Sequence, residues 1–247
     1  MPRYKLTIEY DGTGLAGWQK QPDRPSVQGY LEEAAAQLNE APTEVFGAGR
    51  TDAGVHALAQ VAHVDLAKAI KPYSVMQAFN YHLLPLTQQV VVINAEEVGD
   101  DFQARFSATG RAYWYRIINR RPRLVIANNR AWHIPETLNA KAMHSAAQKL
   151  LGHHDFTTFR STECQAQSPM KTLDKLDVIQ QGEEIHIIAG ARSFLHHQVR
   201  NLVGTLRLIG NGKWSETDLM NALAAKNRSA GGETAPPDGL YLTGVRY

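Results

Sequence analysis

The sequence predicts an α+β protein built from two β-α-β-β-α-β halves. The chain has 247 residues, of which 43% are hydrophobic and 20% charged, and this length can bury a core without disulfide or metal support. Segments in which apolar and polar residues alternate are typical of strands, and segments in which apolar residues recur every three or four positions are typical of helices. The same order of such segments occurs twice along the chain.

The N-terminal half contains one complete copy of this order. Its expected elements are a strand at 4–10, a helix at 27–38, strands at 43–48 and 57–66, a helix from 72 and a strand at 90–95. Ser26 immediately precedes the first apolar stripe, and serine is a preferred N-cap residue. Pro72 is favoured in the first turn of the second helix.

The C-terminal half repeats the order and adds one helix. Its expected elements are a strand at 111–118, a helix at 139–151, strands at 172–179 and 184–191, a helix at 194–209, an extra helix at 215–225 and a strand at 240–247. Residues 230–239 are rich in glycine and proline, and they predict a short loop that could order on binding.

Two β-α-β-β-α-β units predict two ferredoxin-like halves. If their sheets join edge to edge into one largely antiparallel sheet, two free edges are removed. The helices would then lie mainly on one face and leave a ligand cleft on the other. We expect the halves to be residues 1–101 and 102–247, because Gly99, Asp100 and Asp101 precede a change in composition.

Composition excludes several classes of protein. The chain has one cysteine, Cys164, so it can form no intramolecular disulfide, which fits a reducing compartment. Its longest apolar runs are far shorter than the roughly 20 residues that a membrane span needs. The N-terminus alternates charged and apolar residues, unlike a secretion signal. These features predict a cytoplasmic, globular protein with no membrane contact.

The small net charge of +2 conceals a division between the halves. Residues 1–101 carry 7 Lys and Arg against 13 Asp and Glu, whereas residues 102–247 carry 19 against 11. The stretch 102–130 contains seven arginines interleaved with aromatic residues and no acidic residue. Arginine binds phosphate and aromatic rings stack on bases, so the mixture indicates a nucleic-acid surface. A solvated basic strand beside an aromatic core is the alternative interpretation.

The densest group of glycines and functional side chains lies between two predicted strands, at Gly47-Ala-Gly-Arg-Thr-Asp-Ala-Gly-Val-His56. The dinucleotide fingerprint fails because Asp52 takes the third glycine position, and a P-loop fails because Val55 and His56 replace Lys-Ser/Thr. The run therefore predicts a tight loop that displays Arg50, Thr51 and Asp52. A β-hairpin whose aspartate only caps the turn is the alternative interpretation, and a single aspartate does not by itself indicate a catalyst.

Metal ligands are not predicted. The adjacent pairs His153-His154 and His196-His197 point in different directions on a helix or strand, so neither pair chelates readily. We therefore expect no metal site.

Six blocks of sequence together resemble the tRNA pseudouridine synthase A family along nearly the whole chain. The central one is Gly49-Arg-Thr-Asp-Ala-Gly-Val-His56, which resembles the active-site signature of that family. The others are Tyr10-Asp-Gly-Thr-Gly-Leu-Ala-Gly-Trp-Gln19, Asp101-Phe-Gln-Ala-Arg-Phe-Ser107 with Tyr113-Trp-Tyr115, Asp155-Phe-Thr-Thr-Phe-Arg160, Phe194-Leu-His-His-Gln-Val-Arg-Asn-Leu-Val-Gly204 and Gly239-Leu-Tyr-Leu242.

The resemblance implies a reaction, a substrate and an assembly. Members of the family isomerise uridine to pseudouridine at positions 38, 39 and 40 of the tRNA anticodon stem-loop. They have two ferredoxin-like halves that share one sheet, act as homodimers, and use neither cofactor nor metal. We therefore expect tRNA and a second copy of the chain as partners.

The resemblance also implies the catalytic residues. Asp52 would be the nucleophile, Arg200 its basic partner and Tyr113 the ring that stacks on the target uracil. A nearby guanidinium favours the ionised carboxylate. Alternatively, Arg200 is a polar-face residue of a helix and Tyr113 packs in the core. Tyr115 lies on the same strand face as Tyr113 and is left open.

The remaining expected contacts with the RNA are made by arginines. Arg50 would reach into the RNA as the target base leaves the stack, since removing a base costs a few kcal/mol. Arg105 and Arg111 would bind the substrate through its phosphates, and other arginines of 102–130 are further candidates. His56 has no assigned role, and capping of the turn is as compatible with its position as catalysis.

Other functions remain open at this stage. A non-catalytic RNA-binding module would have the same basic surface, and a pseudouridine synthase acting on a different RNA would have the same loop. A glycosylase that cleaves the bond without rejoining it would need a second carboxylate, and the sequence identifies none.

Overall fold

The computed structural model describes residues 1–247, which form two compact units. Unit 1 consists of Met1–Thr109 together with Tyr241–Tyr247, and unit 2 consists of Gly110–Leu240. The last strand therefore belongs with the N-terminal residues, whereas the sequence pattern groups it with residues 102–247. Alternation of apolar residues predicts a strand but does not specify its partner, which explains the difference.

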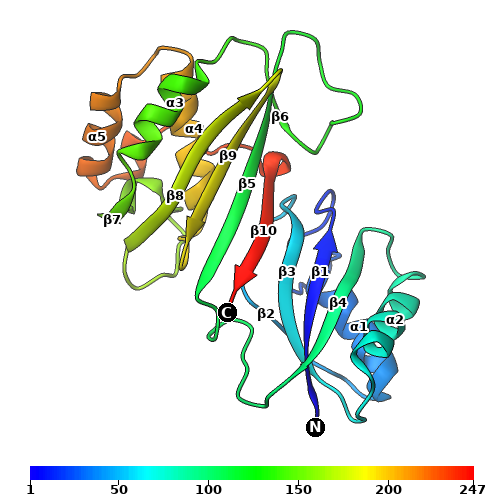
Figure 1. Ribbon diagram of the computed structural model, residues 1–247. Coiled ribbons are helices and arrows are strands. Elements are labelled where there is room, and N and C mark those ends of the chain that lie inside the picture. Colours follow the sequence, from blue (N-terminus) through cyan, green and yellow to red (C-terminus); the bar gives the residue numbers. More distant parts are fainter. The chain divides into compact units, whose positions relative to one another are not determined.

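Unit 1 is a sheet with two helices (Figure 1). Its elements are β1 (Arg3–Tyr10), α1 (Val27–Asn39), β2 (Val45–Gly47), β3 (His56–Asp65), α2 (Pro72–Leu83), β4 (Val90–Val98) and β10 (Leu240–Arg246). The strand order is β4-β1-β3-β10, and β2 also pairs with β3. Strand β1 is antiparallel to both neighbours, whereas β10 runs parallel to β3.

The helices of unit 1 follow the capping signals of the sequence. The Ser26 hydroxyl accepts a hydrogen bond from the backbone N–H of Gly29, and Pro72 occupies the first turn of α2. Their apolar faces are completely buried, with Leu31 of α1 and Phe79 of α2 both 0% exposed. Burial of such side chains is the main stabilising contribution to folding.

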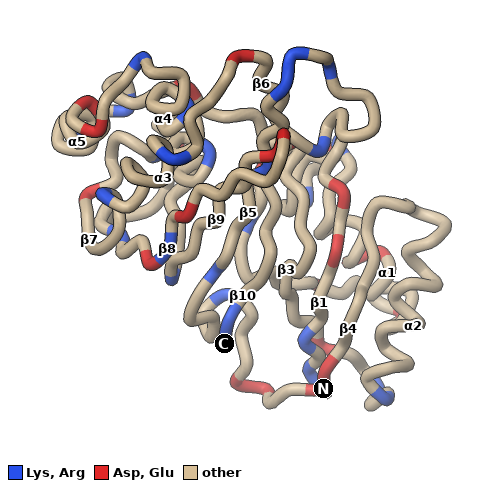
Figure 2. Tube along the Cα trace, turned by 45° about the horizontal axis from the view of Figure 1, so that its top comes forward, with Lys and Arg blue, Asp and Glu red and all other residues tan.

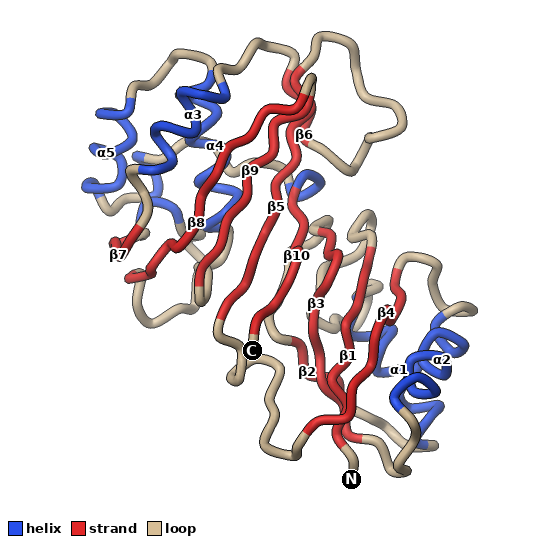
Figure 3. Tube along the Cα trace, in the orientation of Figure 1, coloured by secondary structure: helices blue, strands red, loops and turns tan.

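Unit 2 contains β-strands and three α-helices (Figure 3). Its elements are β5 (Gly110–Asn119), β6 (Trp132–Ile134), α3 (Ala140–Gln148), β7 (Gly152–Asp155), β8 (Met170–Gln181), β9 (Glu184–Ala191), α4 (Gln198–Gly210) and α5 (Glu216–Ala225). The strand order is β5-β9-β8-β7 with antiparallel neighbours, and β6 runs parallel to the end of β5.

The predicted α+β class with largely antiparallel strands is confirmed, and the main differences from the sequence pattern concern three elements. Helix α4 begins at Gln198 instead of 194, because His197 has a left-handed φ of 62° that ends the preceding turn. Strands β6 and β7 have three and four residues, too few to produce a recognisable period. No helix combines the length and the apolar character that crossing a membrane requires.

Candidate active site

Asp52 lies in the loop that joins β2 to β3 in unit 1. The loop begins where the N–H of Ala48 donates to the carbonyl of Val61 at 2.7 Å, and it turns where the N–H of Val55 donates to the carbonyl of Asp52 at 3.2 Å. Gly54 has a φ of 80° within this turn. The Asp52 side chain is half-buried. The predicted tight loop is therefore present, and its backbone bonds at both ends limit its movement.

The residue before Asp52 is fixed by the segment that follows β1. Thr51 is buried, and its hydroxyl lies 2.7 Å from the Tyr10 hydroxyl. Its carbonyl accepts a hydrogen bond from the N–H of Trp18 at 3.0 Å. The side chain of Thr51 is thus held by Tyr10 and its backbone by Trp18, both about 30 to 40 positions earlier in the sequence. This contact fixes the peptide from which the Asp52 carboxylate extends.

Gly17 brings this segment close enough to form these bonds. Its φ is +95°, and a Cβ at this position would lie 2.4 Å from the carbonyl oxygen of Thr51. No side chain fits at that distance, and glycine adopts positive φ without the steric penalty of other residues. The glycine is therefore required by the close contact with the Asp52 loop.

His56 supports the loop from the start of β3. The side chain is 3% exposed, and Nδ1 accepts a hydrogen bond from the N–H of Gly12 at 3.1 Å. An Asp11 carboxylate oxygen lies 3.1 Å from the same nitrogen, and the ring stacks on Tyr241 with centroids 4.7 Å apart. These contacts give His56 a structural role in joining three segments of unit 1.

Tyr113 and Tyr115 have different environments in unit 2. Tyr113 is half-buried on β5, opposite Ala189 of β9, and its ring packs nearly perpendicular to that of Phe194, with ring centroids 5.2 Å apart. Tyr115 is completely buried, and its hydroxyl donates to the carbonyl of Pro236 at 2.8 Å. Burial raises the pKa of Tyr115 well above its ordinary value. Tyr115 is therefore a core residue, and Tyr113 is the one with partial access.

Arg200 extends from the first turn of α4 in unit 2. Its Nε donates a hydrogen bond to the carbonyl of Ala235 at 2.7 Å, and its side chain is half-buried. The helix face opposite to it carries the fully buried Leu202 and Leu206. The side chain is therefore held against the segment that precedes β10.

The six site residues expected from the sequence are divided between the two units. Arg50, Asp52 and Arg105 belong to unit 1, whereas Arg111, Tyr113 and Arg200 belong to unit 2. Within unit 1, only Arg50 and Asp52 share a loop. Both Arg50 and Arg105 are exposed, and the Arg105 guanidinium lies 5.5 Å from the ring centroid of Phe106. In unit 2, Arg111 donates to the carbonyl of Arg192 at 2.8 Å.

Comparison with known proteins identifies the family. A sequence model described as tRNA pseudouridine synthase matches residues 6–107 and 146–247. The chain belongs to the tRNA pseudouridine synthase family. A relative named tRNA pseudouridine synthase A in Rhodopseudomonas palustris (strain BisA53) is 61% identical over 247 residues, which is 100% of each chain. A relative of the same name in Paramagnetospirillum magneticum is 59% identical over 100% of this chain and 96% of its own.

Solved structures also align with this chain. The structure titled "Crystal Structure of a Cbf5-Nop10-Gar1 Complex" aligns over 83% of this chain and 45% of that chain, with a TM-score of 0.37 and 10% identity.

Several residues around the site received no individual role from the sequence, although Tyr10, Gly17 and Trp18 lie in a block that resembles the family. The sequence pattern predicts Tyr10 only as a strand residue, because the hydrogen bond between its hydroxyl and that of Thr51 involves a partner 41 positions away. Trp18 and Gly17 stand in a glycine-rich block, and that richness is the one local sign of a close contact. The segment 231–236, expected only as a loop, is bonded to both Arg200 and Tyr115 through Ala235 and Pro236.

Proposed function

We propose that the chain isomerises uridine to pseudouridine at positions 38, 39 and 40 of the tRNA anticodon stem-loop, with Asp52 as the nucleophile. The observation that carries the proposal is the Asp52 loop: in a member of this family, a half-buried carboxylate stands beside Thr51, whose backbone and side chain are both fixed. A rigid loop suits catalysis, because a displacement of about 1 Å can cost about a hundredfold in rate.

The reaction explains why a carboxylate suffices. The N1–C1′ bond of uridine breaks, the uracil turns, and a C5–C1′ bond forms; the proton on C5 is lost and N1 gains one. Atoms and electrons therefore balance within the nucleotide, without a redox partner, a group donor, a metal or a cofactor. Asp52 either attacks covalently or stabilises the positive charge that develops during bond cleavage.

Arg200 and Tyr113 have proposed roles beside Asp52. The guanidinium of Arg200 keeps the carboxylate ionised and oriented, because an opposite charge favours the anion. The half-buried ring of Tyr113 stacks on the target uracil, and its hydroxyl assists removal of the C5 proton. The complete burial of Tyr115 supports the choice of Tyr113.

The basic residues are proposed to hold the RNA. Arg50 braces the stem as the target base leaves it, and Arg105 and Arg111 contact phosphates. The loop between β5 and β6 adds further positive charge (Figure 2), where Arg121 and Arg123 are exposed. We expect the enzyme to act as a homodimer in the cytoplasm.

Two arginines of the same stretch are engaged within unit 2. Arg116 donates from Nε to Glu184 at 2.9 Å, and Arg120 pairs with Glu183 at 3.1 Å. Their carboxylate partners already neutralise them, so they are weaker candidates for phosphate contacts.

The test uses purified wild type, Asp52→Asn and the control Asp23→Asn, which removes an exposed carboxylate elsewhere in unit 1. Each is incubated with an unmodified tRNA transcript carrying uridines at 38, 39 and 40, with a chelator and no cofactor. Carbodiimide labelling and primer extension map pseudouridine, and filter binding measures tRNA affinity. We expect wild type and Asp23→Asn to form pseudouridine at these positions. Asp52→Asn should bind tRNA but form no pseudouridine.

Three outcomes would contradict the proposal in different ways. If the wild type binds tRNA but forms no pseudouridine, the protein is an RNA-binding module. Wild type that marks other positions or another RNA has a different specificity. Release of free uracil identifies a glycosylase.

A further inference from the structure

Segment 231–236 holds the Arg200 side chain at a defined position on α4. The Nε of Arg200 donates to the carbonyl of Ala235 at 2.7 Å, and the N–H of Ala235 donates back to the carbonyl of Arg200 at 3.1 Å. A guanidinium is planar, so a bond at Nε determines the direction in which its two terminal nitrogens point. The orientation of Arg200 therefore depends on where the Ala235 carbonyl lies.

The segment lies directly on the helix. A Cβ at Gly204, four residues after Arg200, would lie 1.8 Å from the carbonyl oxygen of Glu233. The N–H of Gly232 donates to the hydroxyl of Thr205 at 2.9 Å, and the Thr234 hydroxyl donates to Asn201 at 2.6 Å. These uncharged bonds fix the residues on either side of Glu233.

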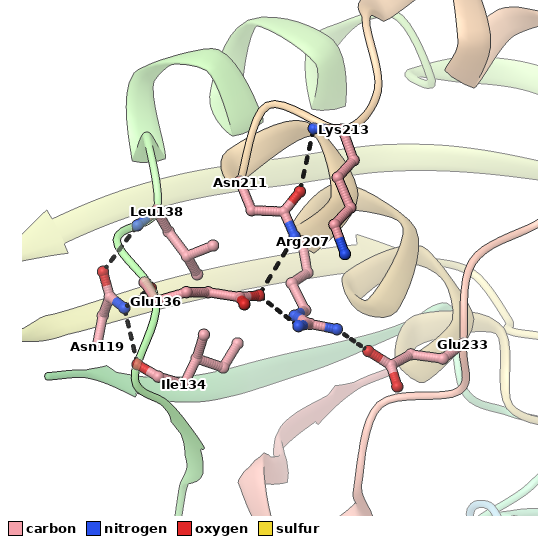
Figure 4. A network of polar contacts seen from close by, with 8 residues as sticks. All are labelled: Asn119, Ile134, Glu136, Leu138, Arg207, Asn211, Lys213 and Glu233. Carbon is pink, nitrogen blue, oxygen red and sulfur yellow. Dashed lines mark hydrogen bonds and ion pairs between the residues drawn. The ribbon is translucent and has the colours of Figure 1, made fainter. Parts of the chain in front are cut away.

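The Glu233 side chain is held by Arg207 (Figure 4). Arg207 lies about two turns along α4 from Arg200. One terminal nitrogen of Arg207 donates to Glu233, and the other donates to Glu136. Glu136 also accepts a hydrogen bond from Asn211 at 3.2 Å. Arg207 therefore connects segment 231–236 to the residues that follow β6.

The guanidinium of Arg207 is itself well fixed. It lies 5.6 Å from the ring centroid of Trp132, a distance at which a cation is attracted to an aromatic face. The Arg207 side chain is 22% exposed, whereas those of Glu136 and Glu233 are 40% and 52% exposed. The cation is thus the less mobile partner, and it anchors Glu233.

Global stability does not explain this arrangement. Ion pairs as exposed as Arg207 with Glu136 or Glu233 contribute little to the free energy of unfolding. The Nε of Arg207 is buried and donates to no atom of the chain, and such a group is unfavourable. The ion pairs of Arg207 therefore act locally, by ordering segment 231–236, which contains Glu233.

We propose that Arg207 is a positioning residue for Arg200. Through Glu233 it keeps segment 231–236 against α4, so that the Ala235 carbonyl keeps the Arg200 guanidinium in one orientation. This inference rests on the proposed role of Arg200 in isomerisation.

The test compares two substitutions with a matched control. Glu233→Gln keeps the shape and removes the charge, whereas Arg207→Lys keeps the charge but cannot donate to two carboxylates in the same geometry. Asp177→Asn is the control, because it breaks another exposed pair of unit 2, with Lys175 at 3.3 Å. The measurements are kcat and KM on the tRNA transcript, and Tm.

We expect both test substitutions to lower kcat by about 10- to 100-fold, as a small displacement of a catalytic group does. KM should change less than about twofold and Tm by less than about 4 °C, the shift that a loss near 1 kcal/mol produces in a domain of this size. Asp177→Asn should leave kcat unchanged. An equal fall in kcat for Asp177→Asn, or a fall that tracks Tm, would overturn the proposal.

A second measurement asks whether the effect passes through Arg200. Residues that act as a unit give non-additive losses, so Glu233→Gln should cost less than about threefold in an Arg200→Lys background. The same 10- to 100-fold loss in both backgrounds would refute the positioning role.

A third measurement does not depend on activity. Nitrogen-15 NMR follows hydrogen exchange at the Nε–H of Arg200, which is protected by its bond to Ala235. We expect Glu233→Gln to accelerate this exchange at least about tenfold, and Asp177→Asn to leave it unchanged. An unchanged rate in Glu233→Gln overturns the inference, whereas a wild type that fails to isomerise uridine overturns the proposed function.

Discussion

Replacement of Gly17 by alanine perturbs the Asp52 loop by a distance that the structure defines. The new Cβ would lie 2.4 Å from the Thr51 carbonyl oxygen and 2.8 Å from the carbonyl carbon of Asp52, whereas ordinary contact begins at 3.4 Å. The loop or the segment carrying Gly17 must therefore move by about 1 Å, and such a displacement can cost about a hundredfold in rate.

The same substitution lowers stability through two separate effects. Alanine at a φ of +95° is destabilised by about 1–2 kcal/mol relative to glycine. Overpacking against the Asp52 loop adds about 1–3 kcal/mol. The free energy of unfolding should therefore fall by about 2–5 kcal/mol in total.

Gly14 offers a matched control for this experiment. Its φ is +77°, but a Cβ there would meet no atom within 4 Å. Gly14→Ala should therefore cost only the backbone part, about 1–2 kcal/mol, and should leave the rate of isomerisation unchanged.

Urea denaturation followed by tryptophan fluorescence measures stability, and single-turnover formation of pseudouridine measures the chemical step. Both variants are assayed at a temperature at which each is folded. If Gly17→Ala and Gly14→Ala lose the same stability and keep the same rate, the contact between Gly17 and the Asp52 loop does not constrain the carboxylate.

Three further predictions concern unit 2. A hydrogen bond from Arg116 lowers the pKa of Glu184 from 4.5 to about 2. The pair therefore stabilises the fold above about pH 4.5, and this contribution is lost as the pH falls towards 2. Because the pair is partly exposed, we expect it to contribute about 1 kcal/mol to the free energy of unfolding. Glu184→Gln should therefore reduce the difference between urea midpoints at pH 7 and pH 3, and an unchanged difference would contradict the assignment. Gly204→Ala should lower the free energy of unfolding by about 3 kcal/mol, because its Cβ would lie 1.8 Å from the Glu233 carbonyl oxygen; wild-type stability would show that the segment is not packed on α4. Arg123→Ala should weaken tRNA binding and reduce the slope of log K against log salt by about 1, and an unaltered slope would exclude a phosphate contact.

Local patterns predicted the regular elements of the fold well. Ser26 and Pro72 mark the starts of α1 and α2, because capping and proline preferences act within a few residues of the backbone. Alternation predicted β1, β8 and β9, since each is long enough to show a period of two. The short strands β6 and β7, with three and four residues, show no period and were missed.

The candidate site was predicted less completely. The glycine-rich block identified the Asp52 loop, and the family resemblance supplied roles for Asp52, Arg200 and Tyr113, which stay predictions. The arginines of 102–130 could not be sorted by sequence, because alternation does not reveal which guanidinium meets a carboxylate. The pairing of Arg116 with Glu184 joins residues 68 positions apart.

The sequence by itself determined the α+β class, the order of the elements and the loop that displays Asp52. Periodicity, capping and glycine content are properties of neighbouring residues, so they can be recognised without knowledge of the fold. Only the tertiary structure decided that Gly17 abuts Thr51, that Tyr115 is buried while Tyr113 is half-buried, and that Arg207 holds Glu233. These contacts depend on which distant segments pack together, and a pattern of neighbouring residues does not specify that packing.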